Sequence, residues 1–322
     1  LSGSSVASAL TMGKVSLAQM DRFNYDTRLS TGVVAAGGTL GILIPPSTGF
    51  VIYAILTEQS IGRLFLAGVL PGILLLMAFL LVIAILCWIK PELGPRGPIT
   101  SWSEKAHAML GAIPIISVVL VTIGGIYGGF FSPVEAAGVG AGLVILYGMI
   151  TRQLTLAAIR EAGRDSVVTT ATVMLILISA HLINPFLALS HIPTVVGEAL
   201  AALHLGVYGT LAVILLIYMV LGCFLEGFAM LVLTLPIFFP VVLALGIDPI
   251  WFGVLVVLTL EMGLISPPVG LNVFIVKSVA PAVPLGRIFV GVLPFWLAML
   301  ATLILLVAFP QISLMLPNTM IR

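Results

Sequence analysis

The stretch GILIPP at residues 41–46 returns near the other end of the chain as GLISPP at residues 263–268. Gly41 pairs with Gly263, and the double proline Pro45-Pro46 pairs with Pro267-Pro268. Because glycine frees the backbone and proline removes a hydrogen-bond donor, each Gly-x-x-x-Pro-Pro stretch predicts a break in a helix. Two further pairs of motifs follow in the same order. GRLF at 62–65 matches GRIF at 286–289, and GVLP at 68–71 matches GVLP at 291–294. Ordered motifs at nearly one offset indicate an internal duplication.

The composition excludes a soluble protein. Of the 322 residues, 61% are hydrophobic and only 8% are charged, against about 25% charged residues in soluble domains. So few charges exclude a soluble enzyme, a nucleic-acid-binding protein and a disordered chain. Apolar runs of about 18 residues or more are each long enough to cross a bilayer as a helix. We therefore predict an all-α polytopic membrane protein with segments at 31–57, 64–89, 106–128, 134–151, 166–189, 206–222, 227–245, 250–280 and 288–309.

Lysine and arginine residues indicate which connections are cytoplasmic. They cluster in three connections, at residues 14–28, 90–105 and 152–164. The positive-inside rule places all three in the cytoplasm, in agreement with the two crossings that separate each from the next. Residues 206–245 then form a hairpin that opens to the outside, and 250–280 returns inward. The charges fit a re-entrant hairpin and two full crossings equally well.

The two double prolines therefore lie in segments of opposite direction, so the repeats are inverted. Inverted repeats with discontinuous helices are typical of secondary transporters that bind substrate near the middle of the membrane. We predict that 31–57 and 250–280 are broken helices, whose exposed carbonyls suit a cation and whose half-helix N-terminus suits an anion. One double proline is also consistent with a plain proline kink. Two in matched, inverted positions favour functional breaks.

The repeat divides the chain into three expected parts. Residues 1–90 are the second half of the first repeat, and residues 91–105 are a cytoplasmic linker. The tip of a first hairpin at Gly3-Ser4-Ser5 is expected to match the stretch from Gly222 to Gly227. The first part contains this tip, the broken helix 31–57 and the helix 64–89. The second repeat, 106–322, contains helices 106–128, 134–151 and 166–189, the hairpin 206–245, the broken helix 250–280 and the helix 288–309. Its first three helices have no counterparts before residue 1, so we expect the first repeat to lack its N-terminal part of roughly 100 residues, at about 20 residues per crossing plus connections.

Long ordered motifs give the chain a resemblance to a known family over residues 1 to about 310. The chain resembles the large membrane (M) subunit of tripartite ATP-independent periplasmic (TRAP) transporters, bacterial uptake systems of the dicarboxylate and sialic acid type. The resemblance implies an elevator-type carrier in the bacterial inner membrane that is driven by a sodium gradient. It also implies two partners, a small four-helix membrane subunit and a periplasmic substrate-binding protein that delivers an organic acid. The matching stretches are GGTLGILIPPS at 37–47, SIGRLFLAG at 60–68, GGFFSPVEAA at 128–137, LPI at 235–237 and GLISPPVGLN at 263–272.

Two candidate sodium sites combine hydroxyl and carbonyl oxygens, the ligands that hard cations prefer. The alternative for the serines is ordinary packing between membrane helices. The family pattern often has aspartate where this chain has Glu226, a longer side chain with the same charge. The first site consists of Ser2, Gly3, Ser4 and Ser5 facing Gly37, Gly38 and Thr39. The second consists of Gly222, Glu226, Thr259, Met262 through its carbonyl, Gly263 and Ser266.

Candidate substrate contacts surround the two double prolines. Asn272 can donate a hydrogen bond to a carboxylate, although satisfying the freed backbone of the break explains it equally well. Glu135 is a candidate as a carboxylate after a glycine-rich turn, and complementing a helix dipole is the alternative. Glu226 and Glu261 are carboxylates within membrane segments, which usually indicates function. The substrate set is Pro45, Pro46, Ser47, Pro267, Pro268, Asn272 and Glu135.

These patterns predict a transport protein and not an enzyme. The sequence contains no nucleophile elbow, zinc-protease motif or phosphate-binding loop, so transport must be driven by a gradient. With the resemblance, this predicts the permease subunit of a sodium-coupled, binding-protein-dependent importer of a small organic acid. The alternative is a stand-alone sodium- or proton-coupled anion symporter, with Glu226 and Glu261 as proton carriers. Channel function is a further alternative, because a broken helix can line a pore.

Overall fold

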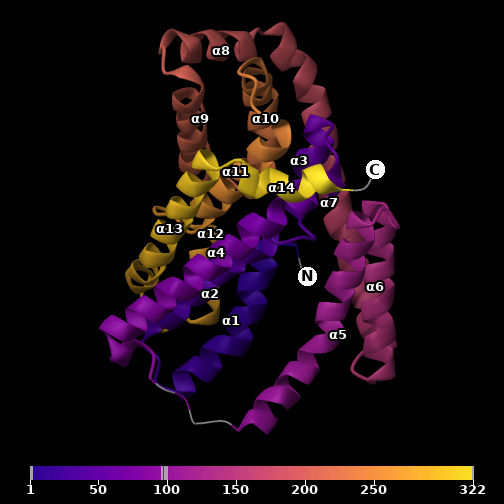
Figure 1. Cartoon of the computed structure of the whole chain (residues 1–322), viewed down its shortest axis with the longest axis vertical. Helices are drawn as coiled ribbons and strands as arrows, with labels where there is room; N and C mark the ends of the chain where they lie inside the picture. Colours follow the sequence, from indigo (N-terminus) through magenta and orange to yellow (C-terminus); the bar gives the residue numbers. More distant parts are fainter. Residues whose placement is uncertain (1–2, 96, 98–100, 321–322) are drawn as a thin grey trace. The chain divides into compact units, whose positions relative to one another are not determined.

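Capping residues, glycines and prolines divide the chain into α-helices joined by short connections (Figure 1). The computed structural model describes residues 3–95, 97 and 101–320. Over these residues the chain has no β-strand, which confirms the all-α prediction. The elements are α1 (Ser5–Arg22), α2 (Thr27–Leu43), α3 (Thr48–Thr57), α4 (Ile61–Ile89), the 3-10 helix η1 (Pro91–Leu93), α5 (Trp102–Tyr127), α6 (Pro133–Ile150), α7 (Leu156–Leu189), α8 (Ile192–Ala202), α9 (Gly206–Gly222), α10 (Gly227–Ala244), α11 (Pro249–Leu264), α12 (Leu271–Val279), α13 (Leu285–Ala308) and α14 (Gln311–Thr319).

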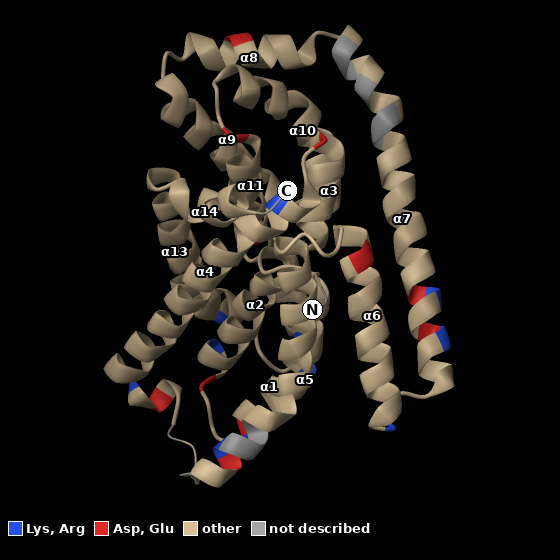
Figure 2. Cartoon of the chain, turned by 45° about the vertical axis from the view of Figure 1, so that its right-hand side comes forward, with Lys and Arg blue, Asp and Glu red and all other residues tan. Residues whose placement is uncertain are grey.

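Among the described residues, six helices are long and apolar enough to cross a membrane. The bent pair α2–α3 raises the number to seven if the pair counts as one span. Figure 2 shows long uncharged lengths along α4, α9 and α13. The six helices of spanning length confirm a polytopic helical membrane protein. The six are α4, α5, α6, the first part of α7, α10 and α13.

The chain folds as two compact units. The first contains Leu1–Arg96 and Ile183–Asn318, and the second contains Gly97–Leu182 and Thr319–Arg322. Both double prolines belong to the first unit, together with helices α1–α4 and α8–α13. Helices α5, α6 and most of α7 belong to the second unit.

Helix caps reproduce the repeat within the first unit. Ser4 caps α1 and Glu226 caps α10, at the same sequence offset as the double prolines, and each accepts a backbone N–H through a side-chain oxygen. Asp26 caps α2 and Asp248 caps α11, again at this offset. The Arg28 guanidinium donates to both oxygens of Asp26, at 3.0 and 2.9 Å, which lowers the pKa of that carboxyl. Helices α1, α2, α3 and α4 therefore correspond in order to α10, α11, α12 and α13.

Helix α11 is the core of the first unit. Every residue from Ile250 to Leu264 is buried, as expected for a helix that is hydrophobic on all sides. The Tyr53 hydroxyl of α3 donates to the Pro249 carbonyl at 2.7 Å, which joins α3 to the start of α11. The Trp251 indole donates to the Leu306 carbonyl of α13 at 3.0 Å. Elements of both repeats are thus anchored to one central helix.

Glycine allows α2 and α13 to cross with their backbones in contact. A Cβ atom added at Gly32 would overlap the backbone of Gly291, and one added at Gly291 would overlap the carbonyl of Arg28. Close approach through small residues is a common way for membrane helices to associate. The crossing holds the first broken helix against the last long helix of the second repeat.

The second unit consists of helices with mostly exposed apolar side chains. A Cβ atom added at Gly140 of α6 would lie 3.0 Å from the Thr122 side chain of α5, so these helices also pack through a small residue. Leu120 and Leu175 are 67% and 65% exposed. Apolar side chains at the surface of long helices are suited to contact with lipid tails or with other membrane helices.

The structure contains helix beyond the predicted segments in four places, at α7, α1, α8 and α14. Helix α7 begins at Leu156, well before the predicted segment 166–189, because its first turns contain charged residues that favour helix without raising the hydropathy. Helix α1 forms where only a hairpin tip is predicted, and the short helices α8 and α14 lie in stretches predicted as connections.

Candidate functional site

The first break interrupts the chain between α2 and α3. The backbone N–H of Ile44 makes the last helical bond of α2, to Leu40, at 3.0 Å. Two prolines without N–H groups follow, and their shared peptide bond is cis. Ser47, which is 2% exposed, then caps α3 by accepting from the Phe50 N–H at 3.2 Å. The two helices are bent by 42°, as the double proline predicts.

The tip before α1 contacts this break directly. The Gly3 carbonyl accepts two hydrogen bonds from Thr48, from its N–H at 3.2 Å and from its hydroxyl at 2.5 Å. Gly3 has φ +63°, and an added Cβ would lie 3.0 Å from the Pro46 carbonyl oxygen. Glycine is therefore required both by the backbone conformation and by the close approach. Gly38 of α2 allows α1 to approach closely, because a Cβ atom added at Gly38 would lie 3.0 Å from the Ser5 carbonyl oxygen.

The second break lies between α11 and α12. The Ser266 hydroxyl donates to the Met262 carbonyl at 2.6 Å and accepts from the Trp296 indole at 2.7 Å. The Pro267–Pro268 peptide bond is cis, like its counterpart in the first repeat. Gly270, with φ +65°, allows the chain to turn into α12. The break therefore presents carbonyl and hydroxyl oxygens next to a buried helix end.

The turn between α9 and α10 contacts this second break. A Cβ added at Gly263 would lie 2.5 Å from the Cα of Gly222, so glycine at 263 is needed for the contact. Glu226 ends the turn, and its Oε2 atom accepts from the N–H groups of Phe228 at 2.9 Å and Ala229 at 3.3 Å. In each repeat, the turn that precedes a capped helix therefore touches the double-proline break of the same repeat.

The two tips converge on Glu261 of α11. This residue is 1% exposed, and its Oε2 atom has no hydrogen-bond partner among the described residues. Ser5 of the first tip and the Glu226 carboxyl of the second tip both act electrostatically on the Glu261 carboxyl. Two neighbouring carboxylates and a hydroxyl form an environment that favours a bound cation.

Asn272 is a second buried polar group without partners. It is fully buried in the first turn of α12, and neither its amide nitrogen nor its amide oxygen has a partner among the described residues. An unpaired buried amide is costly, so it is a suitable group for binding a polar ligand. Thr39 and Thr259, by contrast, donate to Ala36 and Leu255 within their own helices, at 2.6 and 2.8 Å.

The structure brings together part of each predicted sodium set. Gly3, Ser5 and Gly38 lie at the contacts that the first tip makes with α2 and its break. Ser2 lies outside the described residues, and Gly37 faces open space. In the second set, Gly222 touches Gly263, and Ser266 bonds to the Met262 carbonyl.

Glu135 lies in the second unit, where its carboxylate forms a capping box. Its Oε2 atom accepts from the N–H of Ser132 at 2.8 Å and from the hydroxyl of the same residue at 2.8 Å. The reciprocal bond from the Glu135 N–H to the Ser132 hydroxyl completes the box. These bonds account for the carboxylate as a helix cap, the structural alternative predicted from the sequence.

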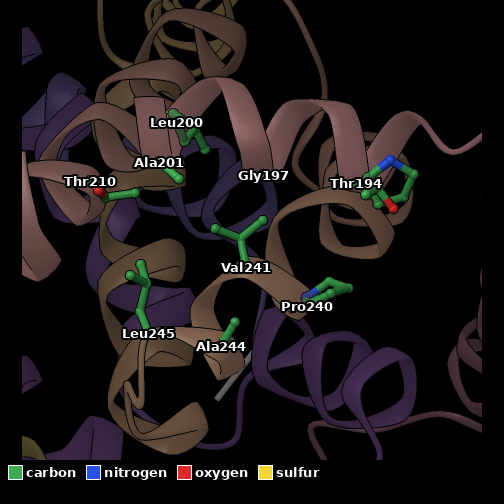
Figure 3. A pocket seen from close by; sticks show the side chains of 10 residues that line it. Thr194, Gly197, Leu200, Ala201, Thr210, Pro240, Val241, Ala244 and Leu245 are labelled. Atoms are coloured by element: carbon green, nitrogen blue, oxygen red, sulfur yellow. The ribbon is translucent and has the colours of Figure 1, made fainter. Parts of the chain in front are cut away.

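A cavity of about 320 Å³ lies between α8, α9 and α10 (Figure 3). Its lining is almost entirely apolar, and the only hydroxyls belong to Thr194 and Thr210. Thr210 and Leu245 lie at the ends of α9 and α10 that are remote from the Glu226 turn. The cavity is therefore separate from the two breaks and lacks the charged or amide groups that would bind an organic acid.

Two residues of the breaks were not singled out by the sequence. Thr48 holds the first tip, and Trp296 holds Ser266 of the second break. For Trp296, the sequence contains a difference between the repeats that could have drawn attention to it. The residue two positions after the GVLP motif is Ile73 in the first copy and Trp296 in the second.

Comparisons with known proteins agree with these features. The family described as "Tripartite ATP-independent periplasmic transporter, DctM component" matches residues 1–312. The C4-dicarboxylate TRAP transporter large permease protein of Pseudomonas aeruginosa is 38% identical, over 99% of this chain and 74% of its own. The sialic acid TRAP transporter large permease protein of Vibrio cholerae is 32% identical over 99% and 74%. The isethionate TRAP transporter permease protein DctMQ of Oleidesulfovibrio alaskensis is 31% identical over 98% of this chain and 49% of its own.

Proposed function

Because the chain belongs to the DctM family of tripartite ATP-independent periplasmic transporters, we propose that it is the large permease subunit of a sodium-coupled importer of a small organic acid. The family consists of membrane permeases, so the chain is a multi-pass membrane transport protein and not an enzyme. A tripartite system includes a periplasmic binding protein and a small membrane subunit. We propose both as partners of this chain.

The observation that carries the proposal is the repeated contact between a tip and a double-proline break. Each break ends a helix inside the apolar first unit and exposes carbonyl oxygens there. At the first break, the Gly3 carbonyl lies against Thr48, and the Ser5 carbonyl lies against Gly38 of α2. At the second, the Ser266 hydroxyl lies against the Met262 carbonyl, and Gly263 lies against Gly222. These sets of oxygens support two sodium sites, and a cation bound near the buried Glu261 carboxyl would favour its ionised form.

The substrate class follows from the relatives and from the polarity of the breaks. Relatives are named for C4-dicarboxylates, sialic acid and isethionate, all of which are organic anions. Helices α3 and α12 begin directly after the breaks, so the positive ends of their dipoles favour a negatively charged group. Asn272 adds an unpaired amide that can donate to a carboxylate. We therefore propose that the anion binds between the breaks, next to Ser47 and Asn272.

The proposed transport cycle is of the elevator type. The first unit contains both breaks and both tips, so it can carry the bound ions and anion as one body. The remaining membrane helices and the small subunit would form the scaffold. The repeats α1–α4 and α10–α13, with the opposite membrane orientations predicted from the charges, support two equivalent end states, one open to each side.

Uptake into liposomes tests the proposal. The permease is reconstituted with its small membrane subunit, and uptake of candidate organic acids is followed with and without a sodium gradient and the cognate binding protein. We expect uptake only when both are present. Uptake with sodium but without the binding protein would favour a stand-alone symporter. Uptake driven by a proton gradient alone would contradict sodium coupling and move the coupling role to Glu226 and Glu261.

Replacing Thr48 by valine is expected to weaken sodium binding at the first break. The change removes the hydroxyl that donates to the Gly3 carbonyl, and the loss of one hydrogen bond of about 1 kcal/mol corresponds to about fivefold in affinity. The half-saturating sodium concentration for uptake should therefore rise about fivefold. Thr48→Ser keeps the hydroxyl and serves as the matched control. Equal sodium dependence in the valine and serine variants would contradict this role of the tip contact.

A further inference from the structure

Ser266 joins helices α11 and α13 at the second break. Its hydroxyl donates to the Met262 carbonyl of α11 at 2.6 Å and accepts from the Trp296 indole of α13 at 2.7 Å. Trp296 is half-buried, and Ser266 is 5% exposed. The indole therefore reaches from a long transmembrane helix to a buried hydroxyl of the break.

The first repeat has no equivalent of this hydrogen bond among its described residues. In the alignment that pairs Gly41 with Gly263, Ile44 stands in the place of Ser266. Ile44 packs against α4 instead, where a Cβ added at Gly72 would lie 2.6 Å from its side chain. The matched positions thus make an apolar contact in one repeat and a polar contact in the other. General packing of the break against its long helix does not require the indole N–H.

The two hydrogen bonds fix the orientation of the Ser266 hydroxyl. A hydroxyl has one proton and two acceptor lone pairs. The proton is directed to the Met262 carbonyl, and the indole N–H occupies one lone pair. The oxygen keeps a single lone pair for a further ligand, in a fixed direction next to the Met262 carbonyl. Without the indole, the hydroxyl could rotate and lose this orientation.

We propose that Trp296 is a positioning residue for the second cation site, which it serves by holding the Ser266 hydroxyl in the orientation that binds sodium. This inference rests on the proposed sodium coupling. Trp296 itself does not touch the ion in this scheme. It acts through Ser266, and it links ion occupancy of the break to helix α13.

Tryptophan fluorescence of the reconstituted permease tests this role without measuring transport. Replacing choline by sodium is expected to change the emission of the wild-type protein, because the ion alters the surroundings of the Trp296 indole. The change should disappear in Trp296→Phe and persist in Trp251→Phe. Trp251 is the matched control, since its buried indole also donates to an oxygen of a neighbouring element, the Leu306 carbonyl. A sodium-dependent change that persists in Trp296→Phe would overturn the proposal.

The sodium dependence of uptake provides the second measurement. The half-saturating sodium concentration is expected to rise about fivefold in Trp296→Phe, as for the loss of one hydrogen bond, and to recover in part in Trp296→His, which keeps a ring N–H. In a Ser266→Ala background, Trp296→Phe should have no further effect. If Trp296→Phe raises the half-saturating sodium concentration equally in the wild-type and Ser266→Ala backgrounds, the proposed route through the hydroxyl is overturned. If wild-type uptake does not depend on sodium, the proposed function fails and this inference with it. Sodium-dependent uptake with an unchanged half-saturation in Trp296→Phe overturns the inference alone.

Discussion

Replacing Glu261 by glutamine is expected to raise the melting temperature of the permease and to lower substrate uptake by more than about tenfold, or about 1.4 kcal/mol in the transport step. The two effects have opposite directions because they have different causes. Glu261 is 1% exposed, and one of its carboxylate oxygens has no partner among the described residues. A buried carboxylate without compensation costs several kcal/mol even after relaxation. A neutral amide of the same size keeps the smaller cost of an unpaired polar group but removes the cost of the buried charge.

The loss of uptake follows from the position of the charge. Ser5 of the first tip and Glu226 of the second tip both act electrostatically on this carboxyl. Removing the charge therefore removes the attraction for a cation at the place where both repeats meet. A carboxylate within a membrane segment is costly and usually indicates a function.

Thermal unfolding in detergent and uptake into liposomes should be measured on the same preparation. Glu198→Gln is the control, because it makes the same chemical change at an exposed position of α8, and neither quantity should change. A lower melting temperature in Glu261→Gln would show that the carboxylate stabilises the fold. Unchanged uptake would exclude Glu261 from ion binding.

Replacing Gly291 by alanine is expected to give the largest loss of stability of any single methyl addition in α13. The added Cβ would overlap the Arg28 carbonyl, and the Gly32 backbone packs against the same point. Backbone atoms cannot move aside as a flexible side chain can, so α2 and α13 would have to separate. Overpacking of this kind typically costs about 1–3 kcal/mol and sometimes more.

Gly286→Ala is the matched control in the same helix. A Cβ added there meets no atom within 4 Å, and alanine favours helix over glycine by up to about 1 kcal/mol. We expect Gly286→Ala to unfold at or above the wild-type temperature and Gly291→Ala to unfold well below it. Equal melting temperatures for the two variants would show that α2 and α13 can separate at Gly291 without a loss of stability. Thermal unfolding in detergent decides between these results.

The sequence was sufficient to predict an all-helical membrane protein and the ends of helices at the two double prolines. Proline without an N–H and glycine without a Cβ act locally, so Pro45 and Pro267 end α2 and α11 wherever those helices pack. The alignment of the first tip was coarser. The sequence comparison matched Gly3-Ser4-Ser5 with the stretch from Gly222 to Gly227, and within these stretches the caps pair Ser4 with Glu226. A capping oxygen fixes the first residue of a helix, and that information is not contained in a glycine match.

Contacts between distant residues could not be predicted. The bond from Trp296 to Ser266 spans 30 residues, and that from Thr48 to Gly3 spans 45. Both depend on how helices pack, which hydropathy does not encode. Glu135 illustrates the opposite case, because its capping box with Ser132 lies within three residues and was readable as a dipole-complementing alternative.

The spacing of the two repeats also records where insertions and deletions have been tolerated. The Ser4 cap is as far from Pro46 along the chain as the Glu226 cap is from Pro268. After the prolines the offset is no longer constant, because it is larger for the pair Gly62 and Gly286 and then decreases again in part. The number of residues therefore differs between the two repeats in the segments that lead to and begin the long helices α4 and α13. Between each cap and its double proline, a helix and its returning partner must meet in register, and a single inserted residue would rotate one against the other by about 100°.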